Sequence, residues 1–207
     1  MSSLPPLLGD GHGRYRVQIL GNSGSGKSTT GRALAELLGL PYISMDRLYW
    51  NPGWAQSSRE EFEAKLRHAL AQDPRGWVVD GNYASSGGIF VGEATTDIIW
   101  LDPPLYVYFP RIAWRTLLRL LRLGPSCSPG CDERFTEVFF SKDSILWWCL
   151  SQHWIVRRRN EERMKLIGLN SGSDVSNRRM RRFGGWGSDV KAWLNDVAAM
   201  VSAKKTS

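Results

Sequence analysis

The residues with the most specific chemistry lie at positions 21–29, where the chain reads GNSGSGKST. The spacing G-x-x-x-x-G-K-S is the Walker A pattern, in which glycines let successive backbone N–H groups turn toward bound phosphates. Lys27 would reach the β- and γ-phosphates of a nucleoside triphosphate, and the Ser28 hydroxyl would bind Mg²⁺. The pattern therefore predicts an ATP·Mg²⁺ site. Its residues are Gly21, Asn22, Ser23, Gly24, Ser25, Gly26, Lys27, Ser28 and Thr29.

A dinucleotide-binding loop is the alternative for this glycine-rich turn. Asp46 lies 20 residues beyond Gly26, where such a loop has the acid that binds a ribose. That interpretation needs a third glycine at position 29, which is Thr29, and it gives Lys27 no role. The loop also follows an apolar run and precedes a helical pattern, which is the setting that a phosphate loop requires. We therefore favour the triphosphate site.

Three carboxylates, Asp46, Asp80 and Asp102, follow apolar runs that predict strands. Ligands of a parallel sheet bind at the carboxyl ends of its strands, where these residues would meet. Asp80 follows the run WVV, which is typical of a Walker B strand, and is predicted to bind Mg²⁺ together with Ser28. Asp46 is the candidate to orient or deprotonate an acceptor hydroxyl. Each of these residues could instead cap a turn, and Asp102, which precedes two prolines, is interpreted in that way.

The elements that must position these residues alternate between short apolar runs and helical patterns. Strands are predicted at residues 15–20, 41–45, 76–80, 97–101 and 164–169. Helices are predicted at residues 27–38, 58–71, 105–123, about 135–162, and 187–202. The near-continuous apolar runs GWVVD and DIIWL favour a sheet that is covered on both faces. The alternation predicts an α/β fold with a parallel sheet, the three-layer α/β/α arrangement of P-loop proteins.

The chain is expected to form one domain, because 207 residues is a usual length for a single domain. Residues 1–13 are rich in Pro and Gly and lack the basic start and apolar core of a signal peptide. They are expected to form a flexible leader before the domain at residues 14–207. The helical stretch between the fourth and fifth predicted strands exceeds a simple crossover. Residues 105–163 are therefore expected to form a helical lid insertion.

Four arginines with helical spacing stand out in this insertion: Arg111, Arg115, Arg119 and Arg122. At about 100° per residue they fall on one narrow face of a helix, while leucines occupy the other faces. Such a face either contacts an anion or is simply solvated. The run of arginines at residues 157–159, on the second predicted lid helix, could close over the same site from the opposite side.

Several motifs occur in order along the chain and together are more distinctive than the phosphate loop. They are GNSGSGKST from Gly21, DRLYWNPGW from Asp46, WVVDGNY from Trp77, IWLDP from Ile99 and GCDER from Gly130. This series resembles the bacterial family labelled "DNA topology modulation protein FlaR-related", among the adenylate-kinase-like and shikimate-kinase-like P-loop kinases. The resemblance covers residues 14–200 and implies a strand order of 2-3-1-4-5 and a mobile lid. It also places Asp80 and Gly81 at the Asp-Gly of nucleoside monophosphate kinases.

The same resemblance implies roles for further residues. Arg111 and Arg115 lie where nucleotide kinases have lid arginines, which stack on adenine and stabilise charge on the transferring phosphate. Nucleotide kinases also follow their Asp-Gly with an arginine for the acceptor phosphate, but residues 81–96 here contain no Lys or Arg. This departure favours a neutral hydroxyl acceptor over a nucleoside monophosphate. The predicted acceptor site consists of Asp46, Trp50, Asn82 and Tyr83; the predicted catalytic residues are Lys27, Asp46 and Arg115. Trp50 and Trp54 could wall this site or belong to the core.

The charge distribution agrees with a polyanionic partner. The net charge is +7, and residues 105–207 carry 18 Lys and Arg against 9 Asp and Glu. Such an excess suits either nucleotide phosphates or nucleic acid. No nucleic-acid-binding motif is visible, so a kinase for an unidentified small-molecule acceptor is favoured. The alternatives are a nucleotide-dependent DNA- or RNA-binding or topology-modulating protein and a nucleotide-gated NTPase module.

The remaining composition argues against several other classes. No apolar run approaches the ~20 residues that span a bilayer, so no membrane segment is expected. Cys127, Cys131 and Cys149 have no second ligand pair at zinc-finger spacing, so no structural zinc is expected. Free thiols and the lack of a signal peptide favour a cytoplasmic location.

Overall fold

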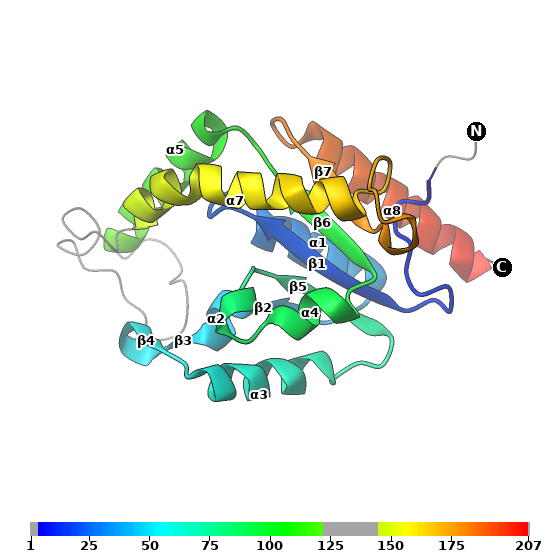
Figure 1. Cartoon of the computed structure of the whole chain (residues 1–207), viewed down its shortest axis with the longest axis horizontal. Helices are drawn as coiled ribbons and strands as arrows, with labels where there is room; N and C mark the ends of the chain where they lie inside the picture. The colour runs from blue at the N-terminus through cyan, green and yellow to red at the C-terminus, as the bar shows by residue number, and fades with distance from the viewer. Residues whose placement is uncertain (1–3, 122–144, 207) are drawn as a thin grey trace.

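The centre of the molecule is a parallel sheet of five strands in the order β2-β5-β1-β6-β7 (Figure 1). The computed structural model describes residues 4–121 and 145–206. The sheet consists of β1 Tyr15–Gly21, β2 Tyr42–Ser44, β5 Gly76–Asp80, β6 Asp97–Leu101 and β7 Met180–Phe183. Counted along the chain, this is the predicted order 2-3-1-4-5, and the predicted α/β fold is confirmed.

Helices cover both faces of the sheet. They are α1 Lys27–Leu38, α3 Arg59–Leu70, α4 Ile89–Ala94, α5 Leu105–Leu120, α7 Ile145–Ile167 and α8 Ser188–Thr206. Side chains alternate along β1, as in any strand. Val17 and Ile19 pack in the core beneath α1 and α8, whereas Leu20 packs with Met164 and Ile167 of α7. A third cluster, around Phe62 of α3, joins α3 and α4 to the edge of the sheet.

The segment between β2 and α3 has more structure than the sequence predicted. It contains α2 Met45–Tyr49, the two-stranded hairpin of β3 Trp50–Asn51 and β4 Ala55–Gln56, and a 3-10 turn at Pro52–Trp54. Two further 3-10 turns lie at Ala84–Ser86 and Val175–Asn177. The compact α2 and hairpin segment follows the carboxyl end of β2 directly, so it carries Asp46 and Trp50 into the region of the sheet edge.

The helix ends agree with their local signals. Gly26 and Gly39 flank α1 with φ angles of 98° and 62°, the left-handed region that glycine adopts most easily. Ser58 precedes α3, and its hydroxyl accepts a hydrogen bond from the Glu61 N–H at 3.1 Å. This is the capping bond expected from the spacing Ser-x-x-Glu.

The fifth predicted strand, at residues 164–169, was wrong. Residues 164–167 form the last turn of α7, and the fifth strand is β7, whose sequence is MRRF. Met164 and Ile167 are three apart and pack onto the sheet from one side of the helix, while Leu166 between them is 56% exposed. β7 is the last strand of the sheet, with an isolated bridge from Gly168 to Met180 on its outer side, and it tolerates two arginines: Met180 is fully buried and the Arg182 guanidinium lies over the ring of Trp100.

The described part of the expected leader, residues 4–13, lies against the domain. Leu7 is 2% exposed and belongs to the core beneath α1 and α8. The N–H groups of Leu8 and Gly9 donate to the carboxylate of Asp97 at 2.7 and 3.0 Å. The indole N–H of Trp193 donates to the Pro6 carbonyl at 2.8 Å. The segment therefore has both core and hydrogen-bond contacts with the domain.

The two helices of the expected insertion flank residues 122–144. The helix predicted at residues 105–123 is α5, and the second predicted helix is α7, which extends five residues further than expected, to Ile167. Arg122, Cys127, Cys131 and the GCDER motif lie outside the described residues. Within residues 4–121 and 145–206, no helix has the length and apolar character needed to cross a bilayer.

Candidate active site

The phosphate loop connects β1 to α1, as the Walker A pattern predicted. Three of its glycines, Gly21, Gly24 and Gly26, have positive φ angles of 152°, 75° and 98°. No side chain caps the N-terminus of α1, and its first turn holds no acidic residue. The first N–H groups of the helix therefore have no side-chain acceptor there, and the helix dipole favours an anion at this end. Loop and helix together have the backbone geometry that the predicted phosphate site requires.

Lys27 folds back over this loop. Its ammonium group donates to the carbonyl oxygen of Asn22, five positions earlier in the chain, at 2.9 Å. The Ser25 N–H donates to the same oxygen at 3.2 Å. Lys27 is half-buried, so its charge lies at the mouth of the loop and away from the hydrophobic core.

Ser28 and Asp80, the two predicted ligands of Mg²⁺, are in contact. The Ser28 hydroxyl donates to Asp80 Oδ2 at 2.7 Å, and the Tyr42 hydroxyl donates to the same oxygen at 2.7 Å. Asp80 is 2% exposed at the carboxyl end of β5. Burial and the adjacent Asp80 charge raise the pKa of Tyr42, so its phenol remains a hydrogen-bond donor.

This pair fits a magnesium ion in the chemistry of its donors. Mg²⁺ prefers oxygen ligands and usually takes one or two from the protein, the rest from water and substrate phosphate. Ser28 and Asp80 supply a hydroxyl and a carboxylate oxygen beside the phosphate loop. No group of three or more His, Cys, Asp and Glu side chains in the described part of the chain could hold a metal by itself.

Asp46 lies close to the same edge of the sheet. It follows β2, which pairs with β5 so that Ser44 is opposite Asp80, and it sits in the first turn of α2. The Tyr83 hydroxyl donates to Asp46 Oδ1 at 2.6 Å. The DRLYW and DGNY motifs, 37 residues apart at this contact, therefore meet in space, and Asn82 lies half-buried in the same turn.

Aromatic rings extend from Asp46 toward the hairpin. Tyr49 contacts both Tyr83 and Trp50, with ring centroids 4.7 and 5.2 Å apart, and Trp50 contacts Trp54 edge to face at 5.5 Å. Tyr49 and Tyr83 also pack against buried Phe62. Trp50 and Trp54 are half-buried, so they lie at the outer end of a cluster that begins in the core. Trp50 and Trp54 are therefore attached to the core cluster, and they remain the predicted border of the acceptor site.

The arginines are divided between two helices. Arg111 and Arg115 are exposed on α5, and at helical spacing they lie beside Tyr108 and Ile112, which pack on the phosphate loop. The side chains of Arg119 and Arg122 lie outside the described ones. Arg157 of α7 pairs with two carboxylates: its Nε lies 3.7 Å from Asp102 Oδ2 and 3.1 Å from Glu161 Oε1.

Sequence reasoning missed two groups of residues at this edge. Asp102, predicted as a turn residue, also accepts a 2.5 Å bond from Arg182 of β7. Tyr106 and Trp186 are 65% and 69% exposed, yet their ring centroids are 5.7 Å apart at the carboxyl ends of β6 and β7. The glycines at residues 184, 185 and 187 around Trp186 were the sequence signal that could have predicted a loop at this position.

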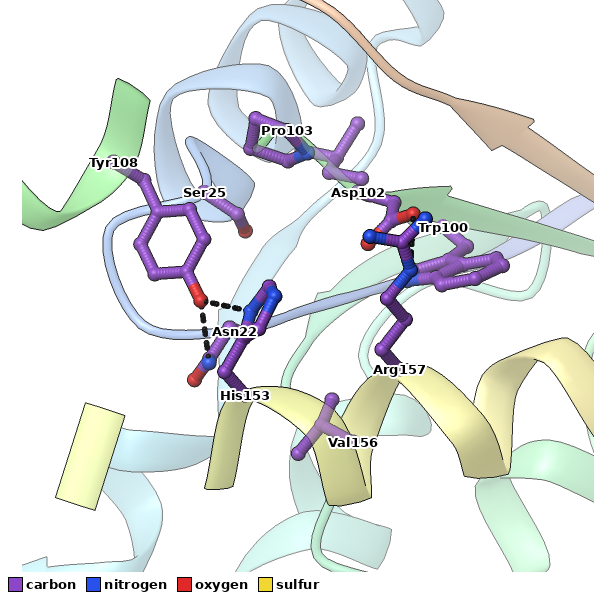
Figure 2. Close-up of a pocket in the computed structure, with 10 residues that line it drawn as sticks. Asn22, Ser25, Trp100, Asp102, Pro103, Tyr108, His153, Val156 and Arg157 are labelled. Carbon is purple, nitrogen blue, oxygen red and sulfur yellow. Dashed lines mark hydrogen bonds and ion pairs between the residues drawn. The ribbon is translucent and has the colours of Figure 1, made fainter. Parts of the chain in front are cut away.

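A small pocket separates the phosphate loop from α7 (Figure 2). Its walls include Asn22 and Ser25 of the loop, Tyr108 of α5, and His153 and Arg157 of α7. The Asn22 side chain and the His153 ring both bond to the Tyr108 hydroxyl. No sequence signal pointed to Tyr108 or His153, because each looked like an ordinary residue of a helix.

Comparisons with known proteins support the fold. No protein-family model and no curated protein matches the chain, so the FlaR-related resemblance has no support from them. A solved structure of a provisionally assigned kinase from Chloroflexus aurantiacus j-10-fl is 16% identical, with 91% of this chain and 98% of that chain covered and a TM-score of 0.50.

Two further solved structures have slightly lower TM-scores. The gluconokinase from Sinorhizobium meliloti 1021 is 16% identical, with 92% of this chain and 93% of that chain covered and a TM-score of 0.48. The shikimate kinase from Bacteroides thetaiotaomicron is 17% identical, with 93% and 99% covered and a TM-score of 0.46. At such identities the similarity describes the fold, which is that of P-loop kinases.

Proposed function

We propose that this protein is a small-molecule kinase that transfers the γ-phosphoryl group of ATP·Mg²⁺ to a hydroxyl group. The observation that carries the proposal is the arrangement at two adjacent strand ends. Ser28 and Asp80 form one oxygen pair beside the phosphate loop, and Asp46 with Tyr83 forms a second after the neighbouring strand. Phosphoryl transfer needs positioning and charge neutralisation more than covalent chemistry, and these groups supply both.

The triphosphate would lie on the phosphate loop, with Lys27 moving from the Asn22 carbonyl to the β- and γ-phosphates. Ser28 and Asp80 would hold Mg²⁺, which supplies positive charge to the phosphate oxygens. Tyr106 and Trp186, exposed and in contact, offer flat surfaces for the base at the far end of the loop. Arg111 and Arg115 would approach the phosphates from α5.

The acceptor would lie against Asp46. As its hydroxyl oxygen attacks the γ-phosphorus, Asp46 takes the hydroxyl proton, and the bond from phosphorus to the bridging oxygen of ADP breaks. Tyr83 keeps the carboxylate oriented through its 2.6 Å bond to Oδ1, which leaves Oδ2 for the acceptor. Residues 81–96 provide no Lys or Arg, so the group presented to this turn is uncharged. Trp50 and Trp54 would border the acceptor on the hairpin side.

The test is phosphoryl transfer from labelled ATP into a pool of metabolites, followed by kinetics with the acceptor it identifies. Asp46→Asn keeps the shape of the side chain but cannot take the proton. We expect it to lower the rate of transfer ~10²–10⁴-fold while the affinity for ATP is nearly unchanged. Asp196→Asn, an exposed carboxylate on α8, is the matched control and should retain full activity. Full transfer by Asp46→Asn would remove Asp46 from the mechanism.

A nucleotide-dependent nucleic-acid binder is the second candidate. Arg158 and Arg159 are exposed on α7, and the half of the chain after residue 104 holds the excess of positive charge. Binding of this type depends on phosphate contacts, so its affinity should fall by orders of magnitude between ~50 and ~200 mM salt. A salt titration with a labelled duplex and a single strand, with and without ATP, separates it from the kinase. Steep salt-dependent binding without transfer to any metabolite would favour this second function.

A further inference from the structure

Three buried side chains connect the phosphate loop to α7. Asn22 of the loop, Tyr108 of α5 and His153 of α7 are 7%, 1% and 5% exposed. Asn22 Nδ2 lies 2.9 Å from the Tyr108 hydroxyl oxygen, and that oxygen lies 2.6 Å from His153 Nδ1. Figure 2 shows the three side chains meeting at the Tyr108 oxygen. Each comes from a different element, so these bonds tie together parts of the molecule that are distant in the sequence.

The direction of the first of these hydrogen bonds follows from the loop. Asn22 Oδ1 accepts from the Ser23 N–H at 2.8 Å, so the Nδ2 of the same amide faces Tyr108 and donates to it. The direction of the second bond depends on the tautomer of His153. A neutral ring with its hydrogen on Nε2 offers Nδ1 as an acceptor for the Tyr108 hydrogen, and this is the tautomer that the inference uses.

The surroundings of His153 favour this neutral form. Burial lowers the pKa of His153; the charge of Asp102 after β6 acts in the opposite direction, and the charge of Arg157 on α7 lowers the pKa further. Tyr108 faces the ring from α5, and the loop contributes the uncharged residues Asn22 and Ser25 to the same pocket. The ring is therefore neutral at neutral pH, and it gains a proton as the pH falls below the ordinary histidine range.

The anchored residue holds the loop together. The carbonyl of Asn22 accepts from both Lys27 Nζ and the Ser25 N–H. The α5 backbone also packs closely on the loop, because a Cβ built on Gly24 would collide with Ile112 and lie 3.1 Å from the Tyr108 carbonyl. A shift of Tyr108 would therefore reach the part of the loop that positions Lys27.

We propose that Tyr108 and His153 are positioning residues of the phosphate loop, which hold Asn22 while His153 Nδ1 remains a hydrogen-bond acceptor. A proton on Nδ1 turns this acceptor into a donor, so the Tyr108 hydrogen loses its acceptor and the ring competes with Asn22 as a donor to the Tyr108 oxygen. The loop is then less firmly held and binds a triphosphate more weakly in mildly acidic solution. The inference rests on the geometry of the loop and α7, and it holds whichever acceptor the protein uses.

The experiment compares the wild type with Tyr108→Phe, His153→Asn and the control Trp114→Phe. Trp114 is 61% exposed on the same helix and has no place in the proposed site. The amide oxygen of His153→Asn can replace Nδ1 as an acceptor and does not titrate. The first readout is the hydrogen-exchange protection factor of amides 22–28 in the ligand-free protein, at about pH 7.5 and about pH 5.5. The second is the dissociation constant of a nonhydrolysable ATP analogue with Mg²⁺.

In the wild type we expect protection of the loop to fall about tenfold on acidification, the effect of one lost hydrogen bond. Tyr108→Phe should have low protection at both pH values, and His153→Asn high protection at both. Trp114→Phe should behave as the wild type. The affinity for the analogue should follow the same pattern. The phosphates of the analogue titrate in the same pH range and change its affinity for every variant. The effect of His153 on the affinity is therefore the pH response of the wild type minus the pH response of His153→Asn.

Other outcomes would overturn the proposal. It fails if the wild-type protection factors are equal at the two pH values, or if His153→Asn keeps the full response to pH. If Tyr108→Phe proves too unstable to measure, the comparison of the wild type with His153→Asn still decides the question. A wild type that does not bind the analogue contradicts the proposed kinase, whereas the protection factors still test the positioning of the loop.

Discussion

At the residue scale, the groups expected to bind phosphate and metal already have partners within the protein. Lys27 donates to the Asn22 carbonyl, and Ser28 donates to Asp80. Both partners are oxygen atoms. In the proposed complex, phosphate oxygens would replace the carbonyl partner of Lys27, and a metal ion with oxygen ligands would join Ser28 and Asp80. A triphosphate therefore replaces one oxygen partner of Lys27 with stronger, charged ones. In the proposed site the ammonium group of Lys27 would serve the ligand, and Lys27 itself is half-buried and outside the buried hydrophobic clusters.

This difference predicts the effect of Lys27→Ala. The affinity for ATP should fall by at least ~10²-fold, because a charge-assisted contact to phosphate is lost, while the unfolding midpoint should change little. Binding is measured by titration with a fluorescent ATP analogue and folding by denaturant unfolding. Lys191→Ala, at an exposed position on α8, is the control for loss of positive charge. Unchanged affinity in folded Lys27→Ala would contradict the phosphate-loop interpretation.

At the scale of elements, α5 carries two neighbouring stripes. Tyr108 and Ile112 are 1% and 4% exposed and pack on the phosphate loop, whereas Arg111 and Arg115 form an exposed outward face beside them. In the proposed site these arginines would meet the charge that develops on the phosphoryl group during transfer.

Arg115→Ala tests this function of the outward face. We expect the turnover number to fall roughly 10²–10³-fold with a small change in the affinity for ATP, because the charge matters most in the transition state. Arg158→Ala is the matched control, since Arg158 is also exposed but lies on α7 and pairs with Glu162 at 3.4 Å. Equal losses in the two variants would indicate a general effect of charge and would argue against a specific role for Arg115.

At the scale of the whole molecule, the N-terminal segment joins the two ends of the chain. Leu7 packs in the core that Trp193 of α8 shares, and Trp193 also donates to the Pro6 carbonyl. The Asp97 carboxylate at the start of β6 accepts from two N–H groups of the same segment. The segment thus covers the end of the sheet opposite the phosphate loop, where it supports the fold without touching the site.

Leu7→Ala should therefore lower stability and leave nucleotide affinity unchanged. Removing a fully buried leucine side chain costs about 2–5 kcal/mol of unfolding free energy, from lost burial and the cavity that remains. Leu4→Ala is the control, because Leu4 is 47% exposed in the same segment. Urea unfolding of both variants gives the comparison. A Leu7→Ala midpoint equal to that of Leu4→Ala would mean that the segment does not contribute to the core.

The sequence by itself determined the features whose signals are local. Residues 27–38 carry a glycine on either side and form α1 with the predicted bounds. The apolar runs GWVVD and DIIWL became β5 and β6 with the predicted bounds, because a strand buried on both faces needs a continuous apolar run. The contact of Ser28 with Asp80 also followed from sequence logic, since parallel strands bring their carboxyl ends to one edge.

Only the tertiary structure decided the features that depend on distant partners. The strand MRRF has no apolar run, and it forms a strand because β6 offers an unpaired edge and Trp100 covers Arg182. Leu7 is buried because α1 and α8 leave room for it. Tyr108 meets Asn22 and His153 across separations of 86 and 45 residues, and no local pattern records such contacts. Local propensity fixes where helices and strands begin, but the packing of elements selects which side chains share a site.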